Sequence, residues 1–446
     1  MQHMPPSPAT FKSAGPLGGR VRVPGDKSIS HRSLMLSALA IGESHIEGLL
    51  EGEDVHATAD ALRAMGAYIV RDAPGTWRVN GVGVGGLLQP EGALEMGNSG
   101  TSTRLLMGLV ASHALTVAFT GDASLSKRPM KRVFDPLSRM GADFTTSPGG
   151  RLPLMVRGAC PAVPIEYRLP VASAQVKSAI LLAGLNTPGI TRVIEPVPTR
   201  DHSERMLIGF GAPLVVEQAE DGARIISITG EGALRPQRIT VPGDPSSAAF
   251  PVVAALLVPG SDIVVENVGL NPTRAGLYEI LRMMGADLTF LDERVVGGEP
   301  VADIRARHSR LVGIDVPPDI APSMIDEFPI LFVAAALAKG RTVTRGLEEL
   351  RVKESDRLAL MARGLSRLGA RVEETEDGLI IEGSDGAPFA TTGGATIAAE
   401  LDHRIAMSFA VAGMVSREPV TVDDMAPVAT SFPGFTAMLR DLGADA

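Results

Sequence analysis

Hydrophobic and polar positions alternate with helical spacing in six stretches of the chain, and each stretch ends in Gly-Ala. Successive glycines lie 70 to 84 residues apart, at Gly66, Gly141, Gly211, Gly285, Gly369 and Gly443. A glycine directly after the last helical residue is a favoured C-terminal stop. Recurrence at a nearly constant spacing predicts one structural repeat used six times.

The second and third repeats show the predicted elements most clearly. In the second, the apolar spacing predicts helices over 101–112 and 129–140 and strands over 115–119, 143–146 and 151–156. In the third, it predicts helices over 175–183 and 201–210 and strands over 190–195, 213–217 and 224–228. Each repeat is thus helix, strand, helix, strand, strand. Right-handed crossovers would place the helices on a face of a sheet.

Two similar tetrapeptides divide the six repeats into two groups of three. Val23-Pro24-Gly25-Asp26 begins the first repeat, and Val241-Pro242-Gly243-Asp244 begins the fourth. A chain of 446 residues is also too long for one ordinary core. We therefore predict two similar α/β domains, residues 21–240 and residues 1–20 with 241–446.

The sixth repeat lacks closing strands, because the sequence stops directly after its Gly-Ala. We expect the segment Thr10 to Lys12 to supply one of them. The second domain would then be discontinuous, with an N-terminal strand in its last repeat.

Composition restricts the class of protein. The 42 basic and 51 acidic residues leave a formal charge of −9, which argues against nucleic-acid partners and a basic membrane surface. The longest apolar runs, 248–259 and 328–338, are shorter than the roughly 18 residues of a membrane span. The single cysteine, Cys160, excludes an internal disulfide and a multi-cysteine zinc site. No leader is visible in residues 1–8, so we expect a cytoplasmic protein.

The first repeat carries a candidate anion site, Gly25-Asp26-Lys27-Ser28-Ile29-Ser30-His31-Arg32. Pro24-Gly25 ends the preceding strand, and Asp26 or Ser28 can cap the helix that follows. Free amides, the helix dipole and two cations then favour a phosphate or carboxylate. The alternative is a capped helix with solvated charges. The spacing of a P-loop is absent.

Corresponding positions in four other repeats also carry functional side chains. They include Gly97 to Arg104 with Lys127-Arg128, Ser173 to Lys177 with Arg200-Asp201-His202, Asp326-Glu327 with Arg351 to Arg357, and Asp402-His403-Arg404. In the fourth repeat, Pro245 and Phe250 replace Lys27 and Arg32. Functional side chains thus occur at the helix starts of five repeats and are absent from the fourth. This distribution predicts a site between the domains. Its cations, hydroxyls and amide suit a substrate with several phosphate or carboxylate groups.

Two carboxylates, Asp326 and Glu354, occur among these cations. A carboxylate repels an anionic ligand, so proton transfer is the functional interpretation. The alternative is that each balances a neighbouring arginine. Glu354 lies three residues before Arg357, and we expect Lys353 and Arg357 to share a helical face.

Four motifs in this order resemble the enolpyruvyl transferases. They are Gly25-Asp26-Lys27, Ser173-Ala174-Gln175-Val176-Lys177, Arg200-Asp201-His202-Ser203-Glu204 and Asn271-Pro272-Thr273-Arg274, and the resemblance extends from Leu17 to Leu442. The branch that includes glyphosate-tolerant bacterial enzymes is especially similar. The resemblance implies two domains of three βαβαββ repeats each, of the inside-out α/β barrel type, which close on the substrates.

The resemblance also implies an activity of the shikimate pathway, towards chorismate and the aromatic amino acids. The enolpyruvyl group of phosphoenolpyruvate passes to the 5-hydroxyl of shikimate 3-phosphate, through a tetrahedral intermediate that releases phosphate. No metal or cofactor is implied, and we expect a monomer. Glyphosate is expected to bind at the phosphoenolpyruvate site.

Roles follow from the resemblance, residue by residue. Shikimate 3-phosphate would be held by Lys27, Ser28, Arg32, Ser173, Ala174, Gln175, Arg200, Asp326 and Lys353. Phosphoenolpyruvate would be held by Lys27, Asn98, Gly100, Thr101, Arg128, Gln175, Arg357 and Arg404. Asp326 would take the hydroxyl proton, while Glu354 and Lys27 would transfer protons at phosphoenolpyruvate.

Two departures from the family pattern matter. Gly100 stands where the tolerant enzymes have alanine, which predicts sensitivity to glyphosate. Near Thr430 the chain lacks a lysine that the better-known branch has, so one cation contact to phosphoenolpyruvate is missing.

Three alternatives differ in class. The UDP-N-acetylglucosamine enolpyruvyl transferases have a cysteine five residues before the arginine of the second repeat, where this chain has Ala123. A non-catalytic anion-binding protein would need the cations but not both Asp326 and Glu354. A dinucleotide oxidoreductase has only the G-x-G-x-x-G match at 81–86, which we interpret as a loop.

Overall fold

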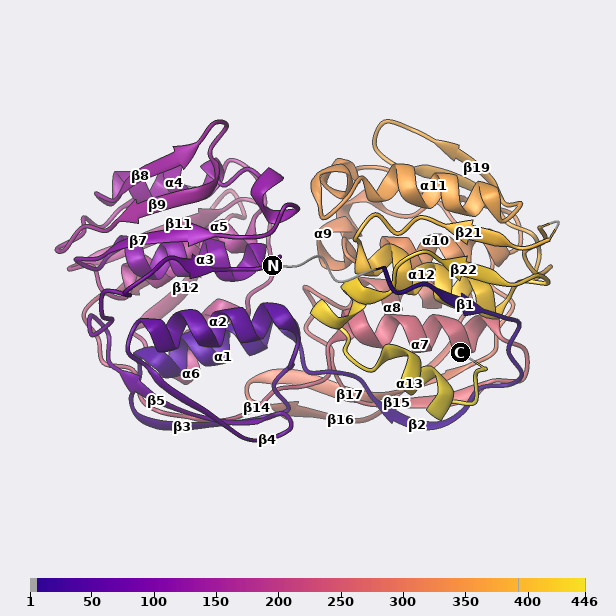
Figure 1. Cartoon of the computed structure of the whole chain (residues 1–446), viewed down its shortest axis with the longest axis horizontal. Coiled ribbons are helices and arrows are strands. Elements are labelled where there is room, and N and C mark those ends of the chain that lie inside the picture. The colour runs from indigo at the N-terminus through magenta and orange to yellow at the C-terminus, as the bar shows by residue number, and fades with distance from the viewer. Residues whose placement is uncertain (1–5, 392, 446) are drawn as a thin grey trace. The chain divides into compact units, whose positions relative to one another are not determined.

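The computed structural model describes residues 6–391 and 393–445 (Figure 1). The chain forms two compact units. We call Gly25–Val241 with Val296–Gly298 the Lys27 unit, and Met1–Pro24, Pro242–Val295 and Glu299–Ala446 the Asp326 unit. Each unit contains three of the six repeats.

Three four-stranded sheets of one topology form the Lys27 unit. Their strand orders are β14-β3-β5-β4, β6-β7-β9-β8 and β10-β11-β13-β12. In each sheet the first two strands are parallel and the remaining neighbours antiparallel. The strands are β3 (Ile41–Glu47), β4 (Tyr68–Ala73), β5 (Thr76–Val82), β6 (Leu94–Glu95), β7 (Thr116–Thr120), β8 (Asp143–Ser147), β9 (Arg151–Arg157), β10 (Glu166–Arg168), β11 (Ile190–Glu195), β12 (Leu214–Gln218), β13 (Arg224–Thr229) and β14 (Arg238–Thr240).

The Asp326 unit contains the sheets β16-β17-β15-β2, β18-β20-β19 and β1-β22-β21. In the fifth repeat the missing first strand is represented by isolated parallel bridges at Val312 and Asp315. The strands are β1 (Ala9–Phe11), β2 (Gly18–Arg22), β15 (Asp262–Gly269), β16 (Asp287–Val296), β17 (Glu299–Arg307), β18 (Arg341–Val343), β19 (Arg371–Glu374), β20 (Leu379–Glu382), β21 (Ala395–Ile397) and β22 (Val420–Val422).

The first helix of each repeat lies in the core of its unit. These inner helices are α1 (Lys27–Leu39), α3 (Gly100–Ala111), α5 (Ala174–Gly184), α7 (Pro245–Leu257), α10 (Phe328–Leu337) and α12 (His403–Met414). α3 packs against α1 and α5, while α7, α10 and α12 pack against one another (Figure 1). Helices such as Phe-Pro-Ile-Leu-Phe-Val-Ala-Ala-Ala-Leu are apolar all round, which suits a position buried on every side.

The second helix of each repeat is α2 (Glu53–Ala64), α4 (Lys131–Arg139), α6 (His202–Gly209), α8 (Gly276–Met283), α11 (Arg357–Arg367) or α13 (Phe435–Asp441). All six end alike. The glycine of each Gly-Ala has positive φ, between 84° and 106°. The alanine amide then donates to the carbonyl five residues earlier, at 2.9 to 3.2 Å. This is the Schellman cap, which glycine adopts without strain.

The elements predicted for the second and third repeats are confirmed, with limits that differ by one or two residues. The N-terminal strand of the sixth repeat is also confirmed. It lies at Ala9–Phe11 and pairs with β22 in antiparallel register, Thr10 opposite Thr421. The chain between β1 and α1 forms one further strand, β2.

The strands that lead into the two Val-Pro-Gly-Asp segments are exchanged between repeats. β2 precedes the first repeat in sequence but pairs with β15 of the fourth, whereas β14 precedes the fourth but pairs with β3 of the first. The predicted limit at residue 20 therefore falls inside β2, and the Asp326 unit continues to Pro24. Among the described residues, no helix is both long and apolar enough to cross a membrane.

Candidate active site

The predicted site residues divide between the two units. The Lys27 unit carries Lys27, Ser28, Arg32, Asn98, Gly100, Thr101, Arg128, Ser173, Ala174, Gln175 and Arg200. The Asp326 unit carries Asp326, Lys353, Glu354, Arg357 and Arg404. Each set is described within its own unit.

The three inner helices of the Lys27 unit are accessible at one end only. Every residue of α1, α3 and α5 is buried except Lys27, Ser28, Thr101, Ala174 and Gln175. Each of the five is the first or second residue of its helix, where unpaired amides and the positive end of the helix dipole occur. The exposed end of this core is therefore an anion-attracting surface built from predicted site residues.

The start of α1 is fixed by two carboxylates. Asp26 caps the helix by accepting a hydrogen bond from the amide of Ile29 at 2.8 Å. Lys27 forms an ion pair with Asp54 of α2, whose side chain is 7 % exposed. Because the cap is Asp26, Ser28 stays available as a hydroxyl at the helix start.

Arg32 lies one turn further along α1 and is buried. Its Nε donates to the Ser203 hydroxyl at 2.7 Å and its Nη2 to the Ser178 hydroxyl at 2.8 Å. Its Nη1 donates to the carbonyl of Ser28 at 2.9 Å. The guanidinium thus joins α1 to α5 and α6.

His31 lies beside these cations. Burial, followed by the charges of Lys27 and Arg32, lowers the pKa of His31 well below its usual value. Its Nδ1 lies 2.8 Å from the hydroxyl of Thr58. This contact fixes the orientation of the imidazole.

Asn98 and Arg128 form a second group. Arg128 Nη2 donates to Asn98 Oδ1 at 2.6 Å and to the Ser124 hydroxyl at 3.1 Å. Asn98 Nδ2 in turn donates to Asp122 at 2.7 Å. The amide therefore fixes the orientation of the guanidinium that was predicted to hold phosphoenolpyruvate.

Gly100 begins α3 beside two guanidinium groups. A methyl group at this position would lie 2.7 Å from Arg104 Nη1 and 3.4 Å from Arg128 Nη1. Arg104 Nη1 donates to Gln175 Oε1 at 3.0 Å, and Gln175 Nε2 donates to the Thr101 hydroxyl at 3.1 Å. Thr101 and Gln175, both predicted site residues, are therefore held together through α3 and α5.

The third repeat carries Ser173, Ala174, Gln175 and Arg200. Ser173 caps α5 by accepting from the amide of Val176 at 3.4 Å, which orients the two residues after it. Arg200 lies just before α6 and is half-buried. It follows Thr199, whose amide and hydroxyl both donate to Glu195 of β11.

A buried ion cluster anchors the Arg200 loop. Lys177 of α5 has no exposed surface, and its Nζ lies 2.9 Å from Glu195 Oε1 and 2.8 Å from Glu204 Oε1 of α6. Arg224 of β13 lies 3.5 Å from Glu195 Oε2. The cluster connects α5, β11, α6 and β13, which are the elements around the loop.

In the Asp326 unit, one guanidinium contacts three carboxylates. Arg357 Nη2 lies 2.6 Å from Glu354, Nη1 lies 3.3 Å from Asp326, and Nε lies 2.8 Å from Asp402. Arg357 is 1 % exposed. The two predicted proton-transfer groups, Asp326 and Glu354, are therefore brought together by the same side chain.

Burial and neighbouring charges have opposing effects on the pKa values of Arg357 and Asp402. Burial disfavours charge on Arg357, but Asp402, then Glu354 and Asp326, outweigh it and raise the pKa of the guanidinium. Burial likewise opposes ionisation of Asp402, yet the charge of Arg357 prevails and lowers the pKa of that carboxyl. Asp402 also caps α12 through the amide of Arg404 at 2.9 Å.

The prediction that Lys353 and Arg357 share a helical face is wrong. Residues Glu348–Val352 form a 3-10 helix, Lys353 follows it, and α11 begins only at Arg357 because Asp356 caps it. Lys353 nevertheless lies 3.6 Å from Asp326 and 2.8 Å from Glu349. The pairing of Glu354 with Arg357 is confirmed.

Several residues of these groups were missed as candidates. Asp54 and Glu195 lie far in sequence from the cations that they contact, so no local pattern indicates the pairing. Arg104 occurs inside a quoted motif, and its position four residues after Gly100 could have indicated its contact with the helix start.

Other sequence interpretations concern residues outside these groups. Residues 83–93 contain no helix or strand, so the glycine-rich match at 81–86 is a loop as predicted, except that Gly81 and Val82 end β5. Cys160 is exposed and lies in the loop between β9 and β10. Thr430 lies at the end of a 3-10 helix, Ala426–Thr430, and donates to Pro427 O at 2.7 Å. Among the described residues, no cluster of three His, Cys, Asp or Glu side chains could hold a metal ion.

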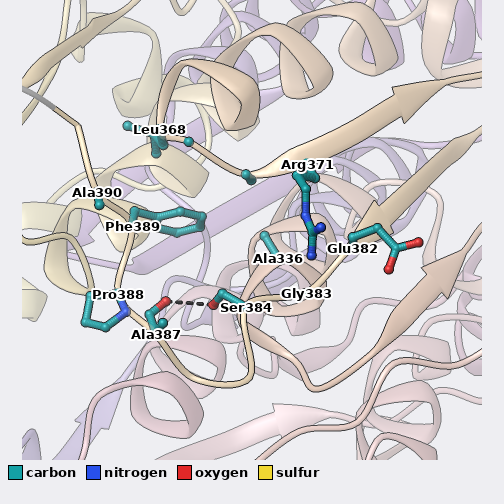
Figure 2. Close-up of a pocket in the computed structure, with 12 residues that line it drawn as sticks. Ala336, Leu368, Arg371, Glu382, Gly383, Ser384, Ala387, Pro388, Phe389 and Ala390 are labelled. Atoms are coloured by element: carbon teal, nitrogen blue, oxygen red, sulfur yellow. Dashed lines mark hydrogen bonds between the residues drawn. The ribbon is translucent and has the colours of Figure 1, made fainter.

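A cavity in the Asp326 unit is separate from the predicted site residues. Its volume is about 180 Å³, and its lining includes Leu368, Arg371, Ser384 and Phe389 (Figure 2). The Ser384 hydroxyl donates to the carbonyl of Ala387 at 2.6 Å. None of the residues predicted to bind substrate lines it.

The fold is that of an enolpyruvyl transferase. The enolpyruvyl transferase NikO from Streptomyces tendae has a similar structure, with a TM-score of 0.77 over 99 % of this chain and 98 % of that one, at 20 % identity. The EPSP synthase from Acinetobacter baumannii is more similar, with a TM-score of 0.87 and 49 % identity over 98 % of both chains.

The sequence comparisons agree with the fold. The model of the family "EPSP synthase (3-phosphoshikimate 1-carboxyvinyltransferase)" matches residues 11–439. The 3-phosphoshikimate 1-carboxyvinyltransferases of Sphingopyxis alaskensis and Novosphingobium aromaticivorans are each 70 % identical, over 98 % and 97 % of this chain and 98 % of each relative. The chain belongs to the EPSP synthase family.

Proposed function

We propose that this protein transfers the enolpyruvyl group of phosphoenolpyruvate to the 5-hydroxyl of shikimate 3-phosphate and releases phosphate. The arrangement around Arg357 carries the proposal. One buried guanidinium holds two half-buried carboxylates, Asp326 and Glu354, in a group otherwise suited to anions. A purely anion-binding protein would use these two negative charges only to balance Arg357.

The chemistry assigns a role to each carboxylate. Asp326 accepts the proton of the attacking hydroxyl, while Glu354 and Lys27 supply the proton that the methylene carbon of phosphoenolpyruvate gains. Loss of a proton from the resulting methyl group and departure of phosphate then restore the double bond. The ion pair with Asp54 orients the ammonium group of Lys27.

Substrate binding is assigned to the remaining residues. For shikimate 3-phosphate these are Lys27, Ser28, Arg32, Ser173, Ala174, Gln175, Arg200, Asp326 and Lys353. For phosphoenolpyruvate they are Lys27, Asn98, Gly100, Thr101, Arg128, Gln175, Arg357 and Arg404. Three of these arginines, Arg32, Arg128 and Arg357, are already held by contacts within the protein. They therefore lose less side-chain freedom when substrate binds. The active species is proposed to be a monomer.

Steady-state phosphate release with shikimate 3-phosphate and phosphoenolpyruvate tests the function. We expect turnover that requires both substrates and needs no added metal or cofactor. Turnover of another hydroxyl acceptor in place of shikimate 3-phosphate would contradict the substrate assignment. The sugar nucleotide UDP-N-acetylglucosamine is the comparison substrate.

Glyphosate is proposed to compete with phosphoenolpyruvate, and Gly100 is proposed to determine its affinity. In Gly100→Ala the new methyl group lies 2.7 Å from Arg104 Nη1, so Arg104 must move and Arg128 is crowded at 3.4 Å. We expect the inhibition constant of glyphosate to rise by about tenfold or more, because this is the usual effect of losing a charged contact. The Michaelis constant for phosphoenolpyruvate, the shorter ligand, is expected to rise less.

Gly209→Ala is the matched control for this prediction. Gly209 lies in α6 of the same unit, and a methyl group there meets no atom within 4 Å. Both constants should be unchanged in this variant. Equal rises of the two constants in Gly100→Ala would contradict a selective effect on glyphosate.

A further inference from the structure

The start of the fourth repeat contains buried polar side chains, although it lacks the cations that are predicted to bind substrate in the first repeat. Pro245 and Phe250 of α7 are buried where the first repeat has Lys27 and Arg32. Asp244 and Ser246 nevertheless correspond to Asp26 and Ser28. Asp244 caps α7 by accepting from the amide of Ser246 at 2.7 Å.

Ser246 is the centre of a buried network. Its hydroxyl donates to Glu327 Oε1 and accepts from Arg274 Nη2 at 2.7 Å. The same Nη2 lies 3.2 Å from Asp244 Oδ1. Ser246, Glu327 and Arg274 are 0 %, 2 % and 3 % exposed. Arg274 ends the motif Asn271-Pro272-Thr273-Arg274, to which the proposed chemistry assigns no role.

The network extends to Arg404 at the start of α12. Arg404 Nη1 lies 3.4 Å from the carbonyl of Ser246 and 3.7 Å from Glu327 Oε1. Glu327 is also the residue directly after Asp326, at the turn that leads into α10. The fourth repeat therefore contacts one predicted phosphoenolpyruvate ligand and the chain neighbour of the proposed base.

We propose that Glu327, Ser246 and Arg274 are positioning residues that fix the guanidinium of Arg404 for phosphoenolpyruvate. The proposal rests on the proposed function. Glu327 lies 3.7 Å from Arg404, and the Ser246 hydroxyl connects it to Arg274. A guanidinium that is oriented before binding loses less freedom when it pairs with a carboxylate or phosphate.

Glu327→Gln tests this role, because glutamine keeps the shape of the side chain and removes its charge. We expect the Michaelis constant for phosphoenolpyruvate to rise about tenfold, the scale of a lost charge-assisted contact. The turnover number and the Michaelis constant for shikimate 3-phosphate should change by less than about threefold, since neither depends on Arg404 directly.

Thr344→Val is the matched control for a merely structural effect. Thr344 is buried in the same unit, and its hydroxyl bonds only to the backbone of Leu379. Its loss should lower the melting temperature without a change in either Michaelis constant. If Glu327→Gln does not fold, Arg274→Lys makes the same comparison, because lysine keeps the charge but not the forked contacts.

A double-mutant cycle with Arg404→Ala separates the two proposals. If Arg404→Ala alone leaves the Michaelis constant for phosphoenolpyruvate unchanged, the role of Arg404 in the proposed function fails. If it raises the constant and Glu327→Gln adds nothing further in that background, the positioning role is supported. Full additivity, or an unchanged constant in both positioning variants, would overturn it.

Discussion

Replacing Asp326 by alanine is expected to lower turnover by roughly a hundred- to ten-thousandfold, the range of positioned acid–base groups. Binding of both substrates should persist. Asp326 lies 3.3 Å from Arg357 and 3.6 Å from Lys353, so its removal leaves two cations with one negative neighbour fewer. Their increased attraction for anionic substrates should offset the contact to shikimate 3-phosphate that Asp326 is proposed to make.

Phosphate release and calorimetric binding, measured on the same preparations, check this expectation. Asp319→Ala is the control, because Asp319 is an exposed carboxylate in the 3-10 helix Pro318–Ile320 that precedes the site. The control should retain the activity of the parent. If Asp326→Ala keeps turnover within tenfold, Asp326 only balances charge. If the parent itself binds both substrates without turnover, the anion-binding alternative is favoured.

The architecture was predictable because it depends on short-range physics. Each Gly-Ala ends a helix through hydrogen bonds within a few residues, so Gly66 or Gly369 reports the same cap wherever it occurs. The inner helices are likewise visible in sequence, since a stretch such as 328–337 is apolar on every side. Equal spacing of these signals then gives the number of repeats.

The site was predictable only where its residues follow such local signals. Ser28, Gly100 and Gln175 lie at helix starts, which the sequence indicates. The contacts that fix the neighbouring cations are not visible in the sequence. Arg32 is fixed by Ser178 and Ser203, and Lys27 by Asp54, through contacts that form only when separate helices pack.

Two differences between sequence and structure have different causes. Lys353 was expected on a helix because its spacing from Arg357 is helical, but the cap at Asp356 starts α11 later. The exchange of β2 and β14 is invisible in sequence, because both strands precede similar tetrapeptides and either could pair with either repeat. The helix limit follows from a local cap, whereas tertiary packing decides which repeat each strand joins.

Replacing Lys177 by methionine is expected to destabilise the protein by about 3–5 kcal/mol, the cost of breaking a buried ion pair from one side. Lys177 and Glu195 have no exposed surface and Glu204 has almost none, so two carboxylates would lose their common cation. Arg224 is 23 % exposed and lies 3.5 and 3.7 Å from them, too far to replace it fully. Urea denaturation measures the change in the free energy of unfolding.

Lys131→Met is the matched control in the same unit. Its Nζ pairs with Asp135 on the surface of α4 and is 71 % exposed, so its loss should cost about half a kcal/mol or less. Because Glu195 holds Thr199 next to Arg200, Lys177→Met should also raise the Michaelis constant for shikimate 3-phosphate. A further Glu204→Gln change should recover part of the lost stability, since it removes one uncompensated charge. Stability equal to that of the control would show that Lys177 does not anchor the loop.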